Sequence, residues 1–472
     1  MLHLRSWSLT RSDKYYMEQD LSKMNISEIE EYLNAEIAHY SLFKHIIVFN
    51  NDSIYDNGEI NKKIITTLFH EFFHYYLQFN SLFNIEGYIH YFSLIKELFV
   101  NRDHINEIIP IIKNFNKLHD PKKYPTALYY FNNWKKRRGD NFRNSTNFRN
   151  SMHIESFNER NKEIDIPFKL GKTYIPQITI SQSKSSAIRS VYDFGEIALN
   201  ESMANLMQSY LKFSNGGIPN TAPLLPYQIL SHLMYQKGYI HLLPIIIFAD
   251  LSMQSPSPGY TFLSLEKKYH DLLSESRSQY YEKNFPELID ELKDIYKKEI
   301  KSGLHKGYID YLEILLFKYL KKSINNNPFF LWIYNKFEQG YKRIKKGELP
   351  YYLIPMFGDD DLENKIKKLF ITFTPPMIAD KETKSSYEYV LFSHFNTAEE
   401  RSEYVANNIF FSGLYQLFLF INTGKIQGCF NYDFCNKSYK DNDCKSRPWC
   451  KGQLDGTCEI GLAAKFYNLQ SH

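Results

Sequence analysis

Cysteine is absent from most of this chain, since no cysteine precedes Cys429 and all five lie between Cys429 and Cys458. A secreted protein of this length usually carries disulfides along the chain, so the distribution indicates a reducing compartment. The first 20 residues hold no apolar run typical of a secretory signal. The longest apolar runs, such as residues 242–251, fall short of the ~20 residues of a membrane-spanning helix. We therefore expect a cytoplasmic protein that has no membrane partner.

A large excess of one charge is also absent, because 57 Lys and Arg residues face 53 Asp and Glu residues and the net charge is +4. Such a balance gives no general attraction to nucleic acid. Residues 134–151 are locally basic and include Trp134, Phe142 and Phe148, a mixture that can bind single-stranded nucleic acid. The segment also carries a polar tandem repeat. We interpret it as an exposed loop and do not expect nucleic acid to be the partner.

The chain is too long for one compact core, and its 472 residues suggest several domains. Hydrophobic periodicity predicts a mostly α fold (α+β) with a small sheet. Helices are expected over residues 59–79, 194–213 and 409–421, a strand over residues 45–49, and a strand pair over residues 166–183. The predicted units are an N-terminal region with a strand (1–58), a zinc-binding core with the inserted basic loop 134–151 (59–260), a helical domain (261–425) and a Cys-rich module (426–472).

One motif carries chemistry, His70-Glu71-Phe72-Phe73-His74, and it lies in a strongly apolar helical segment. Because an α-helix turns about 100° per residue, His70 and His74 lie one turn apart on one face and can bind one metal ion. Glu71 lies beside the first ligand, where its carboxylate can reach a metal-bound water. Buried histidines are unfavourable without partners, and a metal ion satisfies them. The motif therefore predicts a catalytic zinc site.

A catalytic zinc ion needs a third protein ligand and one open position. The best candidate is Glu201, in the segment Asn200-Glu201-Ser202-Met203-Ala204-Asn205. In these two segments the chain resembles the gluzincin (thermolysin-like) zinc metallopeptidases. The resemblance implies that Glu201 is the third ligand. It also implies that Asn205, where the family has Asp, hydrogen-bonds a zinc-binding histidine.

An alternative third ligand is Glu196, which lies five residues before Glu201. The two positions are ~140° apart around the helix, so only one carboxylate can face the metal. The Asn-Glu context favours Glu201. The interval between His74 and Glu201 is longer than in thermolysin-like proteins, although other gluzincins carry insertions.

Zinc chemistry implies the mechanism of such a site. The ion polarises the substrate carbonyl and lowers the pKa of its bound water towards ~7. Glu71 accepts a proton as the water attacks and delivers it to the leaving nitrogen. A hydrogen-bond donor stabilises the oxyanion. The candidates for this donor are Tyr192, His232 and Tyr235, and the sequence does not choose among them.

The C-terminal cysteines follow the pattern Cys429-x5-Cys435-x8-Cys444-x5-Cys450-x7-Cys458 within a polar segment. Such a segment cannot build an apolar core, and in a reducing compartment thiolate coordination is favoured over disulfides. We predict a structural site for a second zinc ion, or alternatively an iron–sulfur cluster. The expected ligands are Cys429, Cys435, Cys444 and Cys458, with Cys450 left over.

The sequence thus predicts a zinc-dependent hydrolase, and the resemblance implies a metallopeptidase that acts on peptide or protein substrates. One alternative is a non-catalytic binding or regulatory protein stabilised by metal. A second alternative is a nucleic-acid-associated factor that binds through residues 135–149.

Overall fold

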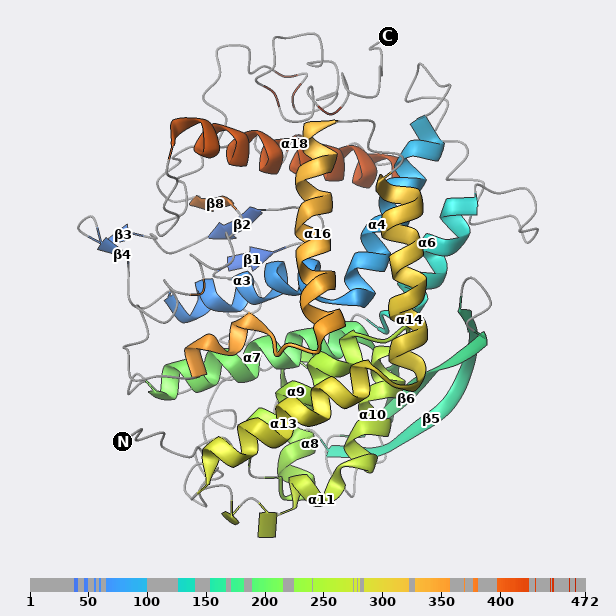
Figure 1. Ribbon diagram of the computed structural model, residues 1–472, viewed down its shortest axis with the longest axis vertical. Helices are drawn as coiled ribbons and strands as arrows, with labels where there is room; N and C mark the ends of the chain where they lie inside the picture. Colours follow the sequence, from blue (N-terminus) through green and yellow to red (C-terminus); the bar gives the residue numbers. More distant parts are fainter. Residues whose placement is uncertain are drawn as a thin grey trace.

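The structure is a computed structural model of the chain (Figure 1). The residues it describes are 38–40, 46–49, 55–56, 59–60, 65–99, 126–140, 153–166, 171–181, 189–214, 225–239, 241–274, 276–277, 279–280, 284–321, 327–356, 369, 377–380, 397–423, 429, 442, 444, 458 and 463.

Helices make up most of the described residues, which confirms the predicted mostly α class. Two of them carry the candidate site, α3 (Ile65–Asn80) and α7 (Glu196–Ser214). A π-helical segment, η4 (Leu315–Leu320), extends α14, and a 3-10 helix, η5 (Tyr351–Met356), follows α16. The other helices are α4 (Leu82–Phe99), α6 (Thr126–Arg137), α8 (Leu225–Lys237), α9 (Leu242–Met253), α10 (Pro258–Lys268), α11 (His270–Leu273), α13 (Phe285–Ile300), α14 (Gly303–Ile314), α16 (Pro328–Lys346) and α18 (Ala398–Thr423).

The described strands form three small sheets. In the first, β2 (Ile46–Phe49) pairs antiparallel with β1 (Ala38–Tyr40) and parallel with β8 (Met377–Asp380), from far along the chain. The second pairs β3 (Tyr55–Asp56) with β4 (Glu59–Ile60). The third is antiparallel in the order β5-β6-β7, and its strands are β5 (His153–Ile166), β6 (Gly171–Ser181) and β7 (Arg189–Asp193).

Most predicted elements are present, with different bounds. The strand expected over 45–49 is β2, and the helix expected over 194–213 is α7. The helix expected from residue 59 begins only at Ile65, because residues 59–60 pair with β3. The strand pair expected within 166–183 is wrong, since β6 fills most of that range and its partners are β5 and β7. The last helix, α18, begins eleven residues before the predicted start at 409.

One hydrophobic core connects most of the described elements, from Ile47 in β2 to Ala463. The predicted boundary at 260/261 falls inside α10, which packs against α9, α7 and β6. Helix α3 lies among α4, α7 and α16 (Figure 1). At its crossing with α16, a Cβ atom on Gly340 would lie 1.9 Å from the carbonyl oxygen of Phe79. The close approach of these helices therefore requires glycine at position 340.

A buried ion pair joins α4 to the C-terminal end of α6. Arg137 Nη2 donates to Glu86 Oε1 at 2.7 Å, and both side chains are fully buried. The hydroxyl of Tyr308 in α14 donates to the other Glu86 oxygen at 2.5 Å. Burial raises the pKa of Glu86, but the charges and hydrogen bonds of Arg137 and His90 together outweigh burial and lower that pKa to about 2. The carboxylate therefore stays ionised in the interior and connects three helices.

This ion pair corrects the first part of the exposed basic loop predicted at 134–151. Residues 134–137 form the last turn of α6, and both Trp134 and Arg137 are buried there. The Trp134 indole N–H donates to the carbonyl oxygen of Phe83 at 2.9 Å. Residues 141–151 lie outside the described part of the chain.

In the part that is described, we find no helix with both the length and the apolar character that a membrane crossing requires.

Candidate metal centre

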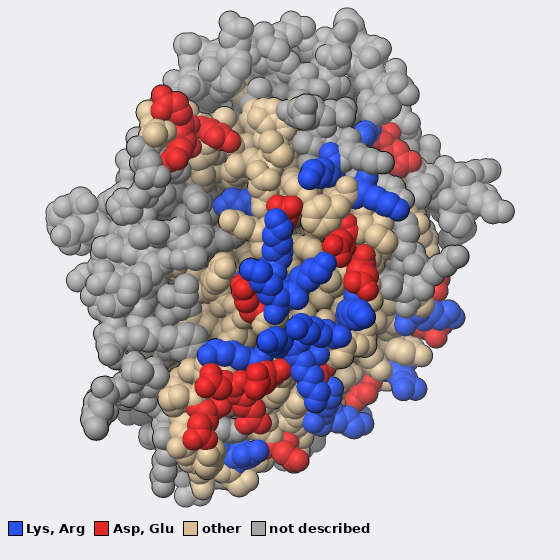
Figure 2. Space-filling model, in the orientation of Figure 1, with Lys and Arg blue, Asp and Glu red and all other residues tan. Residues whose placement is uncertain are grey.

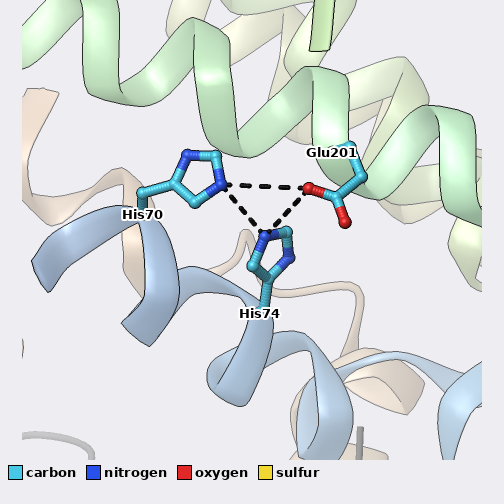
Figure 3. Close-up of side chains that lie close together, drawn as sticks. All are labelled: His70, His74 and Glu201. Atoms are coloured by element: carbon cyan, nitrogen blue, oxygen red, sulfur yellow. Dashed lines mark hydrogen bonds and ion pairs between the residues drawn. The ribbon is translucent and has the colours of Figure 1, made fainter. Parts of the chain in front are cut away.

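Helices α3 and α7 pack against each other and bring three predicted ligands together (Figure 3). His70 and His74 lie one turn apart on α3, and their Nε2 atoms are 3.1 Å from each other. Oε2 of Glu201, on α7, is 3.9 Å from Nε2 of His70 and 3.3 Å from Nε2 of His74. All three ligand atoms lie within 4.8 Å of one another.

The electrostatics of this group follow from its burial, since His70 and His74 are only 6% and 9% exposed. Burial lowers the pKa of His70 despite the nearby Glu201 carboxylate. Burial acts in the same direction on His74, but the charge of Glu201, its hydrogen bond and the charge of Glu71 together outweigh burial and raise that pKa to about 9. Burial raises the pKa of Glu201, yet His74 and His70 together hold it well below its usual value. Glu201 is therefore an ionised carboxylate between two imidazoles.

These residues fit a metal ion. Among the described residues, no group gives Oε2 of Glu201 or Nδ1 of His70 a hydrogen bond of normal geometry. A buried carboxylate oxygen without a well-formed hydrogen bond is unfavourable, and a cation between it and the Nε2 atoms of the two histidines would satisfy it. Two imidazoles and one carboxylate are ligands that divalent transition metals accept. The group can therefore hold a metal ion.

The hydrogen bond that orients His74 comes from an unexpected residue. Nδ1 of His74 lies 3.0 Å from Oδ1 of Asn200, the residue directly before Glu201. The predicted partner, Asn205, instead donates its amide to the carbonyl oxygen of Tyr227 at 3.1 Å. The assignment of Asn205 to a zinc-binding histidine is therefore corrected to Asn200. The signal was present in the sequence, because Asn200 belongs to the same Asn-Glu pair that identified Glu201.

Glu196, the alternative third ligand, pairs with residues other than the histidines. Its Oε2 atom accepts from Arg138 Nε at 2.7 Å, and its Oε1 atom accepts from Asn200 Nδ2 at 3.0 Å. Both oxygens thus have partners outside the metal group. Between the two glutamates, the structure places Glu201 with His70 and His74.

The remaining catalytic candidates differ in burial and surroundings. Glu71 is 7% exposed, and its charge contributes to the raised pKa of His74. The ring of Tyr227, in α8, lies 5.6 Å from the ring of His70 and was not singled out by the sequence.

Of the predicted oxyanion donors, Tyr235 is 45% exposed. Burial and the charge of His153 lower the pKa of His232 to about 4. Tyr192 lies in the edge strand β7.

The C-terminal cysteines are described only in part. Cys444 is buried, and its carbonyl oxygen accepts from the backbone N–H of Cys429 at 2.8 Å. Cys429 and Cys458 pack against the hydrophobic core. Cys435 and Cys450 lie outside the described residues, so the four-cysteine metal site stays a prediction.

Comparison with models of protein families, with curated proteins and with solved structures gave no match. The resemblance to gluzincins therefore rests on the two short segments that carry His70, Glu71, His74 and Glu201.

Proposed function

We propose that this protein is a zinc-dependent hydrolase of the metallopeptidase type, with zinc held by His70, His74 and Glu201. One observation supports the proposal above all. The two helices bring together the three side chains that the motif and the Asn-Glu segment predict as ligands. Three protein ligands leave a fourth position for water or substrate, which is the arrangement of catalytic rather than structural zinc sites.

In the proposed reaction each side chain has a separate task. Zinc, when bound, supplies Lewis acidity for a scissile carbonyl and for a water. Glu71 accepts the proton of the attacking water and delivers it to the leaving nitrogen. Tyr227 is our candidate for the oxyanion donor, because its ring centre lies 5.6 Å from that of His70. Asn200 holds the ring of His74 in the orientation that ligation needs.

The test compares the wild-type chain with Glu71→Gln on a peptide library, with products read by mass spectrometry. We expect the wild type to cleave and Glu71→Gln to lose roughly 10²- to 10⁴-fold in kcat while it keeps its zinc. Equal cleavage by both proteins would remove Glu71 from the mechanism. Absence of cleavage by the zinc-loaded wild type would favour the alternative, a non-catalytic protein stabilised by metal.

The nucleic-acid alternative has less support. This alternative depends on the basic residues within 135–149. Of these, Arg137 is buried in the ion pair with Glu86, and Arg138 pairs with Glu196. Figure 2 shows Lys and Arg side chains across the middle of one face, with Asp and Glu side chains alongside them. One such pair is formed by Lys345 and Glu313. Mixed charge of this kind is typical of a solvated surface.

A further inference from the structure

Behind the metal centre, a line of hydrogen bonds passes from His74 through Asn200 and Glu196 to Arg138 in the turn after α6. Its three links measure 3.0, 3.0 and 2.7 Å. The Glu196 side chain is fully buried. An ionised carboxylate in such a place requires a charged or hydrogen-bonded partner, and Arg138 and Asn200 are its partners.

The chemistry of the groups at the far end fixes the direction of every link. A guanidinium only donates hydrogen bonds, and an ionised carboxylate only accepts them. Asn200 must therefore turn its NH2 group to Glu196 and its oxygen to His74. His74 in turn must carry a proton on Nδ1, which leaves the lone pair of Nε2 for the metal.

Arg138 is itself held in place by several contacts. Its guanidinium lies 5.2 Å from the ring centre of the buried Trp134. Its backbone oxygen accepts from the N–H of Ile197 at 2.9 Å, in the first turn of α7. A Cβ atom on Gly195 would lie 2.6 Å from that same oxygen, so the backbones of the two segments are in close contact. Arg138 is thus fixed relative to α7.

We infer that Glu196 and Arg138 are positioning residues of the metal centre, which act through Asn200 to hold His74 in its metal-binding tautomer. The inference rests on the proposed metal site. It also assigns a role to Arg138, from the basic segment 134–151, and to Glu196, the glutamate that is not a metal ligand. Substitutions behind a metal ligand typically weaken metal affinity by roughly 10- to 100-fold.

Glu196→Gln tests the direction of the hydrogen bonds. The new amide oxygen must accept from Arg138, which turns the new NH2 group towards Asn200. Asn200 then accepts with its oxygen and turns its own NH2 group towards Nδ1 of His74. The His74 proton moves to Nε2, where it blocks the metal. We expect zinc affinity, measured by chelator competition on the full chain, to fall roughly 10- to 100-fold.

The double substitution Glu196→Gln with Asn200→Asp should reverse this loss. The new carboxylate at position 200 accepts both from the new amide at position 196 and from Nδ1 of His74. The original direction of the hydrogen bonds returns, and the number of charges is unchanged. Zinc affinity should return to about the wild-type value, and the Co²⁺ absorption spectrum should again match that of the wild type.

A matched control is available in Glu86→Gln, which disrupts the pair that Glu86 forms with Arg137, the residue next to Arg138; this pair is also 2.7 Å long and is fully buried. It should lower stability but leave the zinc affinity of the folded protein unchanged.

Arg138→Gln, at a partly exposed side chain, covers the case in which Glu196→Gln does not fold, and it should weaken zinc binding by several-fold. Unchanged affinity in Glu196→Gln and Arg138→Gln, or no recovery in the double variant, would overturn the inference. A wild type that binds no zinc would instead overturn the proposed function itself.

Discussion

Nε2 of His70 and Nε2 of His74 lie 3.1 Å apart and both face the carboxylate of Glu201. Two imidazole lone pairs at this distance repel each other unless a proton or a metal ion lies between them. The hydrogen bond from His74 Nδ1 to Asn200 holds one ring proton on the opposite side, so Nε2 is the nitrogen that can exchange its proton for a metal ion. The geometry is therefore suited to a cation bound by both rings.

The first prediction concerns metal content, measured by elemental mass spectrometry on protein purified without chelator or an affinity metal. We expect two metal ions per wild-type chain, one at the His/His/Glu group and one at the cysteines. His70→Ala, His74→Ala or Glu201→Ala should each remove one ion, because two remaining ligands hold zinc weakly. A chain that ends at Lys425 should lose the other ion.

Glu71→Gln is the control for metal content, because it changes the same helix without removing a ligand. It should keep the full metal load. If the histidine variants also kept the full load, the central group would not be a metal site.

The second prediction concerns Tyr227, whose ring lies beside His70. Tyr227→Phe keeps the ring and removes only the hydroxyl. If this hydroxyl stabilises the oxyanion, kcat should fall by roughly 10²-fold while KM and zinc content hardly change. The matched control is Tyr235→Phe on the same helix, at a 45% exposed side chain. A loss of activity in Tyr235→Phe but not in Tyr227→Phe would reverse the assignment.

The sequence was sufficient for the part of the site that depends on local periodicity. His70 and His74 share a face because the helix repeats every 3.6 residues, and the Asn-Glu pair marked the facing helix. It was insufficient for side chains whose partners come from other elements. Arg137 and Arg138 were predicted to lie in an exposed basic loop, because no neighbouring residue in the sequence indicates that Glu86 and Glu196 would neutralise them. The pairing of β2 with β8 is a contact of the same long-range kind.

The third prediction concerns the crossing of α3 and α16. Gly340→Ala would place a methyl group 1.9 Å from the carbonyl oxygen of Phe79. The helices must separate to accept it, and overpacking of this kind costs about 1–3 kcal/mol. Because α3 carries both histidine ligands, zinc affinity should fall as well. Urea unfolding and zinc titration measure the two effects, with Gln339→Ala on the exposed side of α16 as the control. Equal stability of the two variants would mean that the helices separate without penalty.

The last prediction concerns acid stability and the Glu86–Arg137 ion pair. The pKa of Glu86 falls from 4.5 to about 2 in the folded protein. A carboxyl group with a lowered pKa stabilises the fold above its unfolded value, and this stabilisation is lost as the pH falls towards the folded value. Glu86→Gln leaves Arg137 buried without its counter-charge, so at pH 7 it should lower the free energy of unfolding by about 3–5 kcal/mol. The difference between wild type and variant should shrink between pH 4.5 and about 2, where Glu86 itself becomes neutral. Urea unfolding across this pH range measures the effect.

Glu163→Gln removes an ion pair with Lys172 in which both side chains are exposed, and it should show no such pH-dependent difference. A difference between wild type and Glu86→Gln that stayed constant from pH 7 to 2 would show that packing, and not the ionised carboxylate, accounts for the loss.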